Sequence, residues 1–70
     1  MNRIHPDKLQ GSAWTARHPR DAEKHFVVRS VHREGGRIAR VRLEAVHSGR
    51  VFEIGWRELR DDAVWLTGWR

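Results

Sequence analysis

Two short glycine-containing stretches, Gly35-Gly36 and Ser48-Gly49, constrain the fold of this chain more than any other feature. Each pair is typical of a two-residue hairpin loop between neighbouring antiparallel strands. From His25 onward, the segments around the two pairs are rich in alternating apolar and polar side chains. The sequence therefore predicts three consecutive strands that fold as an antiparallel meander.

The two hairpins assign the same side chains to the same face of this sheet. Counting back from the first turn pairs Val28 with Leu43, and counting out from the second turn pairs Val41 with Trp56. A slip of one residue in either hairpin would turn the apolar side chains of a strand toward water, so the agreement supports both registers. The apolar face is the predicted core layer and contains Phe26, Val28, Ala39, Val41, Leu43, Ala45, Phe52, Ile54 and Trp56.

The C-terminal tail is the segment best suited to cover this apolar face. Three of the four tryptophans lie in the last fifteen residues, and one buried tryptophan removes about 200 Å² of surface from water. A meander with one apolar face needs such a cover. We predict a short helical turn over residues 56–59, a break at Asp61 and Asp62, and a last short strand within residues 64–69.

These elements predict a mainly all-β protein. The expected architecture is a small antiparallel meander bent into an SH3-like, partly open barrel of four to five strands, with a short helical turn near the C-terminus. A meander capped by a short helix is the alternative. Residues 1–11 are expected to form a partly ordered arm, and residues 12–70 a single small β domain. The first strand is expected over residues 12–16, followed by a loop over residues 17–24 in which Asp21 is a suitable helix cap.

Composition and motif content exclude several classes of site. The 70 residues include no cysteine, and no apolar segment resembles a signal peptide or a membrane span, so we expect a cytoplasmic protein without a membrane partner. The five histidines lack metal-ligand spacing, and we expect no cofactor. No hydroxyl lies in a nucleophile motif, and a barrel of this size is expected to have no interior volume for a substrate pocket. We therefore predict a protein that is not an enzyme.

Tryptophan-centred motifs are spread along nearly the whole chain. They read Lys8-Leu9, Ser12-x-Trp14-Thr15-Ala16, Pro19, Glu23-Lys24-His25-Phe26-x-Val28, Leu43-Glu44-Ala45-Val46, Trp56-Arg57-x-Leu59 and Trp65-x-x-Gly68-Trp69. In this combination the chain resembles a family of short bacterial proteins, the tryptophan-rich conserved hypothetical proteins. The resemblance implies a bacterial, cytoplasmic, single-domain protein, and it carries over no catalytic or ligand-binding residues.

Arginines dominate the predicted outer face of the sheet. That face contains Val27, Arg29, Val31, Arg33, Ile38, Arg40, Arg42, Glu44, Glu53 and Arg57. In the expected register Arg29 lies opposite Arg42, and Arg40 lies opposite Arg57. Like charges directly across a sheet are destabilising, and an anionic ligand would relieve their repulsion. The alternative is a solvated face, on which Glu44 and Glu53 neutralise part of the charge.

The net charge of +5 favours anionic partners. We therefore predict a nucleic-acid-binding module, for RNA or single strands, in which an exposed tail tryptophan stacks on a base. The predicted contact residues are Arg29, Arg40, Arg42, Arg57, Arg33, Arg17 and Trp69. The alternative is a protein-interaction or assembly module without a nucleic-acid role. Such a module would use a sheet edge and the tryptophan tail against a partner protein or a second copy of the chain.

Overall fold

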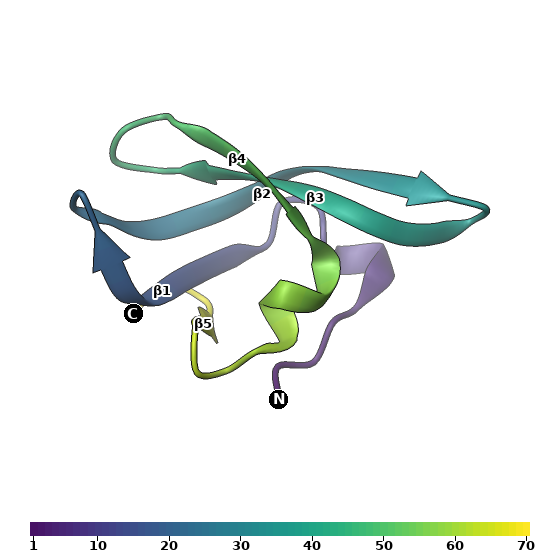
Figure 1. Ribbon diagram of the computed structural model, residues 1–70, viewed down its shortest axis with the longest axis horizontal. Helices are drawn as coiled ribbons and strands as arrows, with labels where there is room; N and C mark the ends of the chain where they lie inside the picture. Colours follow the sequence, from purple (N-terminus) through teal and green to yellow (C-terminus); the bar gives the residue numbers. More distant parts are fainter.

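Four strands follow one another as a meander, and a fifth strand at the C-terminus pairs with the first (Figure 1). The computed structural model describes residues 1–70. The strands and the two short 3-10 helices are η1 (Pro6–Lys8), β1 (Ala13–Arg20), β2 (Glu23–Glu34), β3 (Arg37–Ala45), β4 (Val51–Gly55), η2 (Trp56–Arg60) and β5 (Trp65–Thr67). All pairings are antiparallel, in the order β4-β3-β2-β1-β5. The predictions of a mainly β fold, of up to five strands and of a short helical turn near the C-terminus are confirmed. The outer strands β4 and β5 do not pair with each other, so the sheet is open at this point, and the SH3-like detail of the prediction is not confirmed.

The β2–β3 hairpin has the predicted turn at Gly35 and Gly36, and both glycines have the positive φ that a two-residue loop requires. The ladder begins and ends in the predicted register, with Val28 opposite Leu43. Between the Val28–Leu43 pair and the Arg33–Ile38 pair, each strand contains one extra residue, which is Arg29 in β2 and Ala39 in β3. A single bulge reverses the faces of a strand, and a second bulge on the partner strand restores the register.

These two compensating bulges change the faces between them. Val31 lies opposite Val41, and Ile38 lies opposite Arg33. Val31 and Ile38 both pack against the core cluster. Arg33 shares the face of Ile38, because directly opposite residues of an antiparallel pair point to the same side. The prediction that Val31, Arg33 and Ile38 belong to the outer, polar face is therefore wrong. Regular alternation cannot reveal a pair of bulges whose effects cancel at both ends of the ladder.

The β3–β4 hairpin has a longer loop than the sequence predicts. Leu43 lies opposite Phe52 and Val41 opposite Ile54, which moves β4 by two residues relative to the predicted register. The loop over residues 46–50 is closed by the N–H of Ala45, which donates to the carbonyl of Arg50 at 2.8 Å. Because the shift is even, every side chain of β4 keeps its predicted face. The predicted pairing of Val41 with Trp56 is wrong, since Trp56 begins η2.

Strand β1 extends four residues beyond its predicted end and forms a hairpin with β2. Arg20 lies opposite Glu23, so the loop predicted over residues 17–24 is wrong. The two turn residues, Asp21 and Ala22, have φ values of 54° and 61°. Both angles are typical of a type I′ turn, but alanine rarely adopts them, which is why the sequence carries no clear turn signal here.

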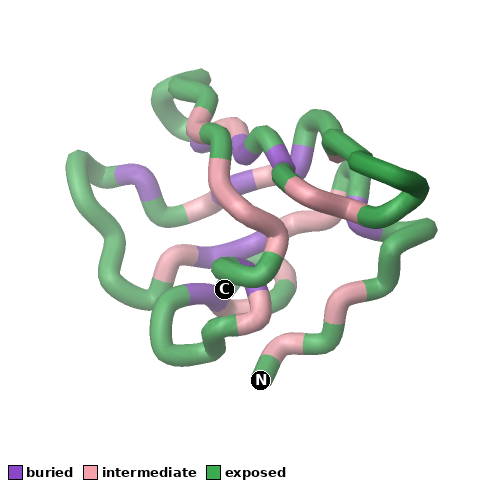
Figure 2. The backbone as a smooth tube through the Cα atoms, turned by 45° about the vertical axis from the view of Figure 1, so that its right-hand side comes forward, coloured by how far each residue is buried: buried purple, intermediate pink, exposed green.

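The core lies between the apolar face of the sheet and the tail that returns beneath it. Figure 2 shows buried segments in the middle of the strands and exposed hairpin tips. The buried apolar residues are Leu9, Trp14, Phe26, Val28, Val41, Leu43, Ala45, Leu59 and Trp65. Trp65 is 9% exposed and meets the ring of Phe26 edge to face, with ring centroids 5.1 Å apart. The tail therefore covers the sheet, as predicted.

The N-terminal residues contact this tail. The side-chain amide of Asn2 donates to the carbonyls of Leu59 and Trp65, both at 2.8 Å. The N-terminal ammonium group forms an ion pair with Asp62, and Leu9 is buried in the core. Residues at opposite ends of the chain are thereby joined on one side of the molecule.

Candidate nucleic-acid interface

On the outer face of the sheet, the predicted arginine pairs are replaced by arginine–glutamate pairs. Arg29 is the bulged residue of β2, and Ser30 lies opposite Arg42. Arg40 lies opposite Gly55 rather than Arg57. Both predicted like-charge pairs are therefore wrong, because the bulge and the longer β3–β4 loop move the partners along the strands.

The acidic side chains of this face neutralise much of its charge. Arg29 donates a hydrogen bond to Glu44 at 2.9 Å. Arg40 donates to Glu53 at 2.8 Å, and Arg42 lies 3.8 Å from the same carboxylate. The hydrogen bond from Arg29 holds the pKa of Glu44 below its ordinary value, and the same bond raises the pKa of Arg29. Three arginines thus share two glutamates, and little positive charge remains free on this face.

Two further predicted contact residues lie away from that group. The Arg17 side chain donates through Nε to the carbonyl of Asp62 at 2.9 Å, which holds it against the tail. Trp69 is 54% exposed, but its indole N–H donates to the carbonyl of Phe26 at 2.9 Å and its ring lies 5.9 Å from that of His25. Trp69 therefore lies against the beginning of β2.

Arg33 and Arg57 come together in a basic hollow at the other end of β2. The hollow has a volume of about 470 Å³ and lies between the tip of the β2–β3 hairpin, η2 and the N-terminal segment. We call it the basic hollow, and its lining residues are Ile4, Pro6, Arg33, Gly36, Arg37, Ile38, Trp56 and Arg57. Arg33 lies eight positions after His25 along β2, which corresponds to about 26 Å. Trp69 and the basic hollow therefore form separate surfaces.

The basic hollow combines an aromatic ring with arginines that have no acidic partner. The guanidinium groups of Arg57 and Arg60 each lie 5.7 Å from the centroid of the Trp56 ring. Arg33, Arg37 and Arg57 take part in no ion pair. A smaller hollow beside it shares Ile4 and Trp56 and adds Arg3 and Arg60. The half-buried indole of Trp56 thus lies among five arginines, Arg3, Arg33, Arg37, Arg57 and Arg60.

Sequence reasoning found only part of this group. Trp56 was assigned to the core, and it does pack against the core cluster while also lining the hollow. Arg3, Arg37 and Arg60 are not among the predicted contact residues. Arg57 and Arg60 lie three residues apart in the predicted helical turn, and side chains at this spacing share one side of a 3-10 helix. This spacing is the sequence feature that could have placed Arg60 beside Arg57.

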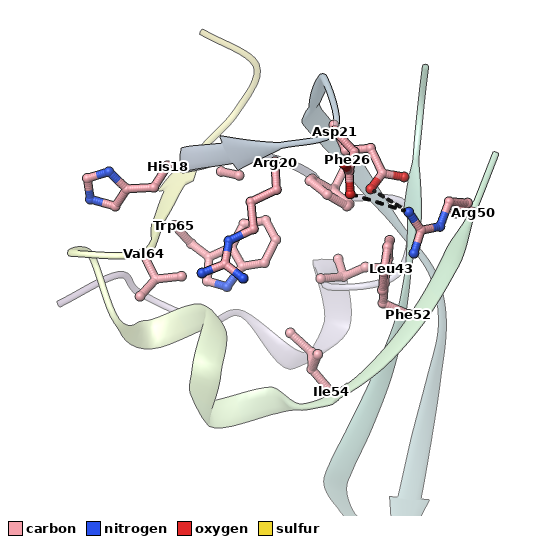
Figure 3. A pocket seen from close by; sticks show the side chains of 12 residues that line it. His18, Arg20, Asp21, Phe26, Leu43, Arg50, Phe52, Ile54, Val64 and Trp65 are labelled. Atoms are coloured by element: carbon pink, nitrogen blue, oxygen red, sulfur yellow. Dashed lines mark hydrogen bonds and ion pairs between the residues drawn. The ribbon is translucent and has the colours of Figure 1, made fainter. Parts of the chain in front are cut away.

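A second hollow, which we call the apolar cleft, lies between β1 and β4 (Figure 3). Its volume is about 310 Å³, and it is an open cleft on the surface rather than a cavity enclosed within the sheet. The hollow exists because the sheet curls without closing. Its lining residues are Ala16, His18, Arg20, Asp21, Glu23, Phe26, Leu43, Arg50, Phe52, Ile54, Val64 and Trp65.

At the edge of the apolar cleft, Glu23 is 5% exposed and is held by two donors. It accepts hydrogen bonds from the Ser48 hydroxyl at 2.5 Å and from Arg50 at 3.3 Å. Arg50 also lies over the ring of Phe52, 5.0 Å from its centroid. The charge of this buried carboxylate is therefore compensated within the fold.

The sequence model of one protein family matches this chain over residues 12–70, and that family is described as Tryptophan-rich protein (DUF2389). The chain belongs to this family. The match includes all four tryptophans of the chain and confirms the resemblance seen in the sequence. No curated protein matches this member of the tryptophan-rich family. No solved structure matches it either. None of its helices is long and apolar enough to span a membrane.

Proposed function

We propose that this member of the tryptophan-rich family is a non-catalytic module that binds RNA or another single-stranded nucleic acid through the basic hollow. The observation that carries the proposal is the position of Trp56 among arginines that have no acidic partner. An arginine whose charge is not neutralised by the protein is available to a phosphate. An aromatic face beside such arginines offers a stacking surface for a base.

The shape of the basic hollow favours a single strand over a duplex. Its volume of about 470 Å³ falls within the range typical of sites for small molecules and nucleotides. Trp56 is half-buried at its wall, so a base must leave its own stack to reach the indole. Bases of loops and single strands do this readily, whereas bases in a duplex remain stacked.

The surrounding arginines would act on successive phosphates. Arg33 and Arg37 flank the tip of the β2–β3 hairpin, and Arg3 and Arg60 line the adjoining hollow. A strand whose base stacks on Trp56 can therefore pass arginines on both sides. Arg40 and Arg42 on the outer sheet face are paired with Glu53, so their contribution to binding is expected to be smaller.

Fluorescence anisotropy with a labelled, unstructured oligouridine tests this proposal. The double variant Arg33→Gln/Arg37→Gln is expected to weaken binding and to reduce its dependence on salt, because each lost phosphate contact removes released counterions. Arg40→Gln/Arg42→Gln is the matched control, since it also removes two exposed arginines, and both of these already have Glu53 as an acidic partner. Trp56→Leu is expected to weaken binding by about 5- to 150-fold, which corresponds to one stacked base.

Two results would contradict the proposal. The first is the absence of binding at low salt. The second is an equal loss of affinity in the Arg40→Gln/Arg42→Gln and Arg33→Gln/Arg37→Gln variants, because binding would then depend on overall charge alone. Both arginine sites are exposed, so these variants test binding without a change in the core.

A further inference from the structure

The apolar cleft separates two strand edges of the same sheet. Phe52 and Ile54 of β4 line one side, and His18 and Arg20 of β1 line the other (Figure 3). The sheet order places β4 at one end of the sheet, with no neighbour beyond it. The cleft is therefore bordered by a strand that has main-chain groups available for pairing.

The free main-chain groups of β4 can be assigned from its ladder with β3. Ala45 donates its N–H to Arg50, so these residues form a hydrogen-bonded pair. Hydrogen-bonded and non-hydrogen-bonded pairs alternate in antiparallel sheets. The N–H and C=O groups of Val51 and Glu53 consequently point away from β3. The N–H of Gly55 donates instead to the Glu58 carboxylate at 3.1 Å, which ends the free edge.

The facing edge of β1 does not offer the same groups. The N–H of Arg17 donates to the carbonyl of Val64 at 2.8 Å, and β5 pairs no further along β1. Arg20 and Glu23 flank a two-residue turn and form its closing pair, so the nitrogen of Pro19 is directed away from β2. Proline has no N–H to donate, which protects this edge from pairing. The β4 edge is therefore the side of the cleft that can accept a strand.

The charges at the cleft and along the β4 edge indicate which kind of segment could pair with β4. Arg50 is occupied by Glu23, and it also lies 3.8 Å from Asp21. Arg20 lines the cleft and makes no ion pair or side-chain hydrogen bond, so it is available to an acidic group. A second copy of the chain is disfavoured, because full antiparallel pairing of two β4 strands would place Glu53 opposite Glu53.

We propose that an extended segment of a partner protein adds to β4 as a further strand of the sheet. Its main chain pairs with Val51 and Glu53, and its alternate apolar side chains enter the cleft above Phe52 and Ile54. An acidic residue of the segment meets Arg20. This peptide site lies apart from the basic hollow and does not depend on nucleic-acid binding.

The test uses a fluorescein-labelled, end-capped peptide in which valine alternates with threonine and one cleft-facing valine is replaced by glutamate, with binding followed by anisotropy. Val51→Pro removes one outward N–H without removing a hydrogen bond to β3, and Val51→Ala is its matched control. Loss of one main-chain hydrogen bond is expected to weaken binding by about three- to tenfold in Val51→Pro relative to Val51→Ala. Arg20→Gln is expected to weaken binding of this peptide and to leave unchanged the binding of a version in which glutamine replaces its one glutamate.

A peptide with N-methylated main-chain nitrogens keeps the test decisive if Val51→Pro does not fold. It retains the side chains but has no donors, so binding to the wild-type protein should be lost. Undiminished binding of the N-methylated peptide would overturn strand addition and indicate a site for apolar side chains alone. Absence of binding by the parent peptide would also overturn the proposal. The proposal would also be overturned if light scattering showed a dimer and the dimer did not bind the peptide. The β4 edge would then be occupied by a second copy of the chain.

Discussion

The substitution Trp65→Ala tests the conclusion that the tail supports the whole fold. Trp65 is 9% exposed, and its ring meets Phe26 edge to face at 5.1 Å. Replacement of a buried tryptophan by alanine costs about 3–5 kcal/mol, because transfer energy is lost and a cavity remains. A chain of 70 residues has a total stability of about 4–10 kcal/mol. The substitution should therefore remove a third or more of the free energy of unfolding.

Thermal and urea denaturation followed by circular dichroism measure this effect. At about 4–8 °C per kcal/mol for a domain of this size, the Tm should fall by at least about 12 °C. Val64→Ala is the matched control, because Val64 precedes Trp65 in the tail and is 45% exposed. Its effect should stay within about 0.5 kcal/mol. If Trp65→Ala lost less than about 1 kcal/mol, the tail would not be the main cover of the core.

Three further predictions follow from the same structure. Truncation after Asp62 removes β5 and Trp65, so the shortened chain should show no cooperative melt in calorimetry; a melt near that of the full chain would contradict the covering role of the tail. Ala22→Gly should raise the free energy of unfolding by about 1 kcal/mol in urea denaturation, because Ala22 has a φ of 61° that glycine adopts without strain, and an unchanged midpoint would refute this. The pKa of Glu44 is lowered by its hydrogen bond from Arg29, so the pair stabilises the fold above the ordinary glutamate pKa and is lost as the pH falls through the lowered value. Carbon NMR of the Glu44 carboxyl group should show a lowered pKa that returns to its ordinary value in Arg29→Gln, and equal values in both proteins would exclude the pair as the cause.

Much of the fold could be predicted because its signals are local. Gly35-Gly36 specifies a tight turn whatever the rest of the chain does, and its ladder begins in the predicted register. The second turn was less informative, since a shift of two residues leaves Phe52 and Ile54 on the same face. The β1–β2 turn was missed because Ala22 rarely has a positive φ.

The candidate site could be predicted only in part. The sequence indicated that arginines would gather on a sheet, and Arg33 and Arg57 do line the basic hollow. The alternative, in which Glu44 and Glu53 neutralise part of this face, agrees with the observed ion pairs. The sequence did not indicate which arginines pair with each glutamate, because the bulge in β2 and the longer β3–β4 loop set the register. One bulge and one longer loop thus moved the expected interface from the sheet face to the hollow beside Trp56.

By itself, the sequence determined the strands, the apolar face and the need for a tryptophan-bearing tail, because alternation and turn chemistry act between residues near one another in the chain. The tertiary structure alone decided the two hollows, the free edge of β4 and the partners of each arginine. These features depend on the distances between strands and on where a curled sheet stops short of closing. Such distances are set by the packing of the whole chain, and no local pattern of residues records them.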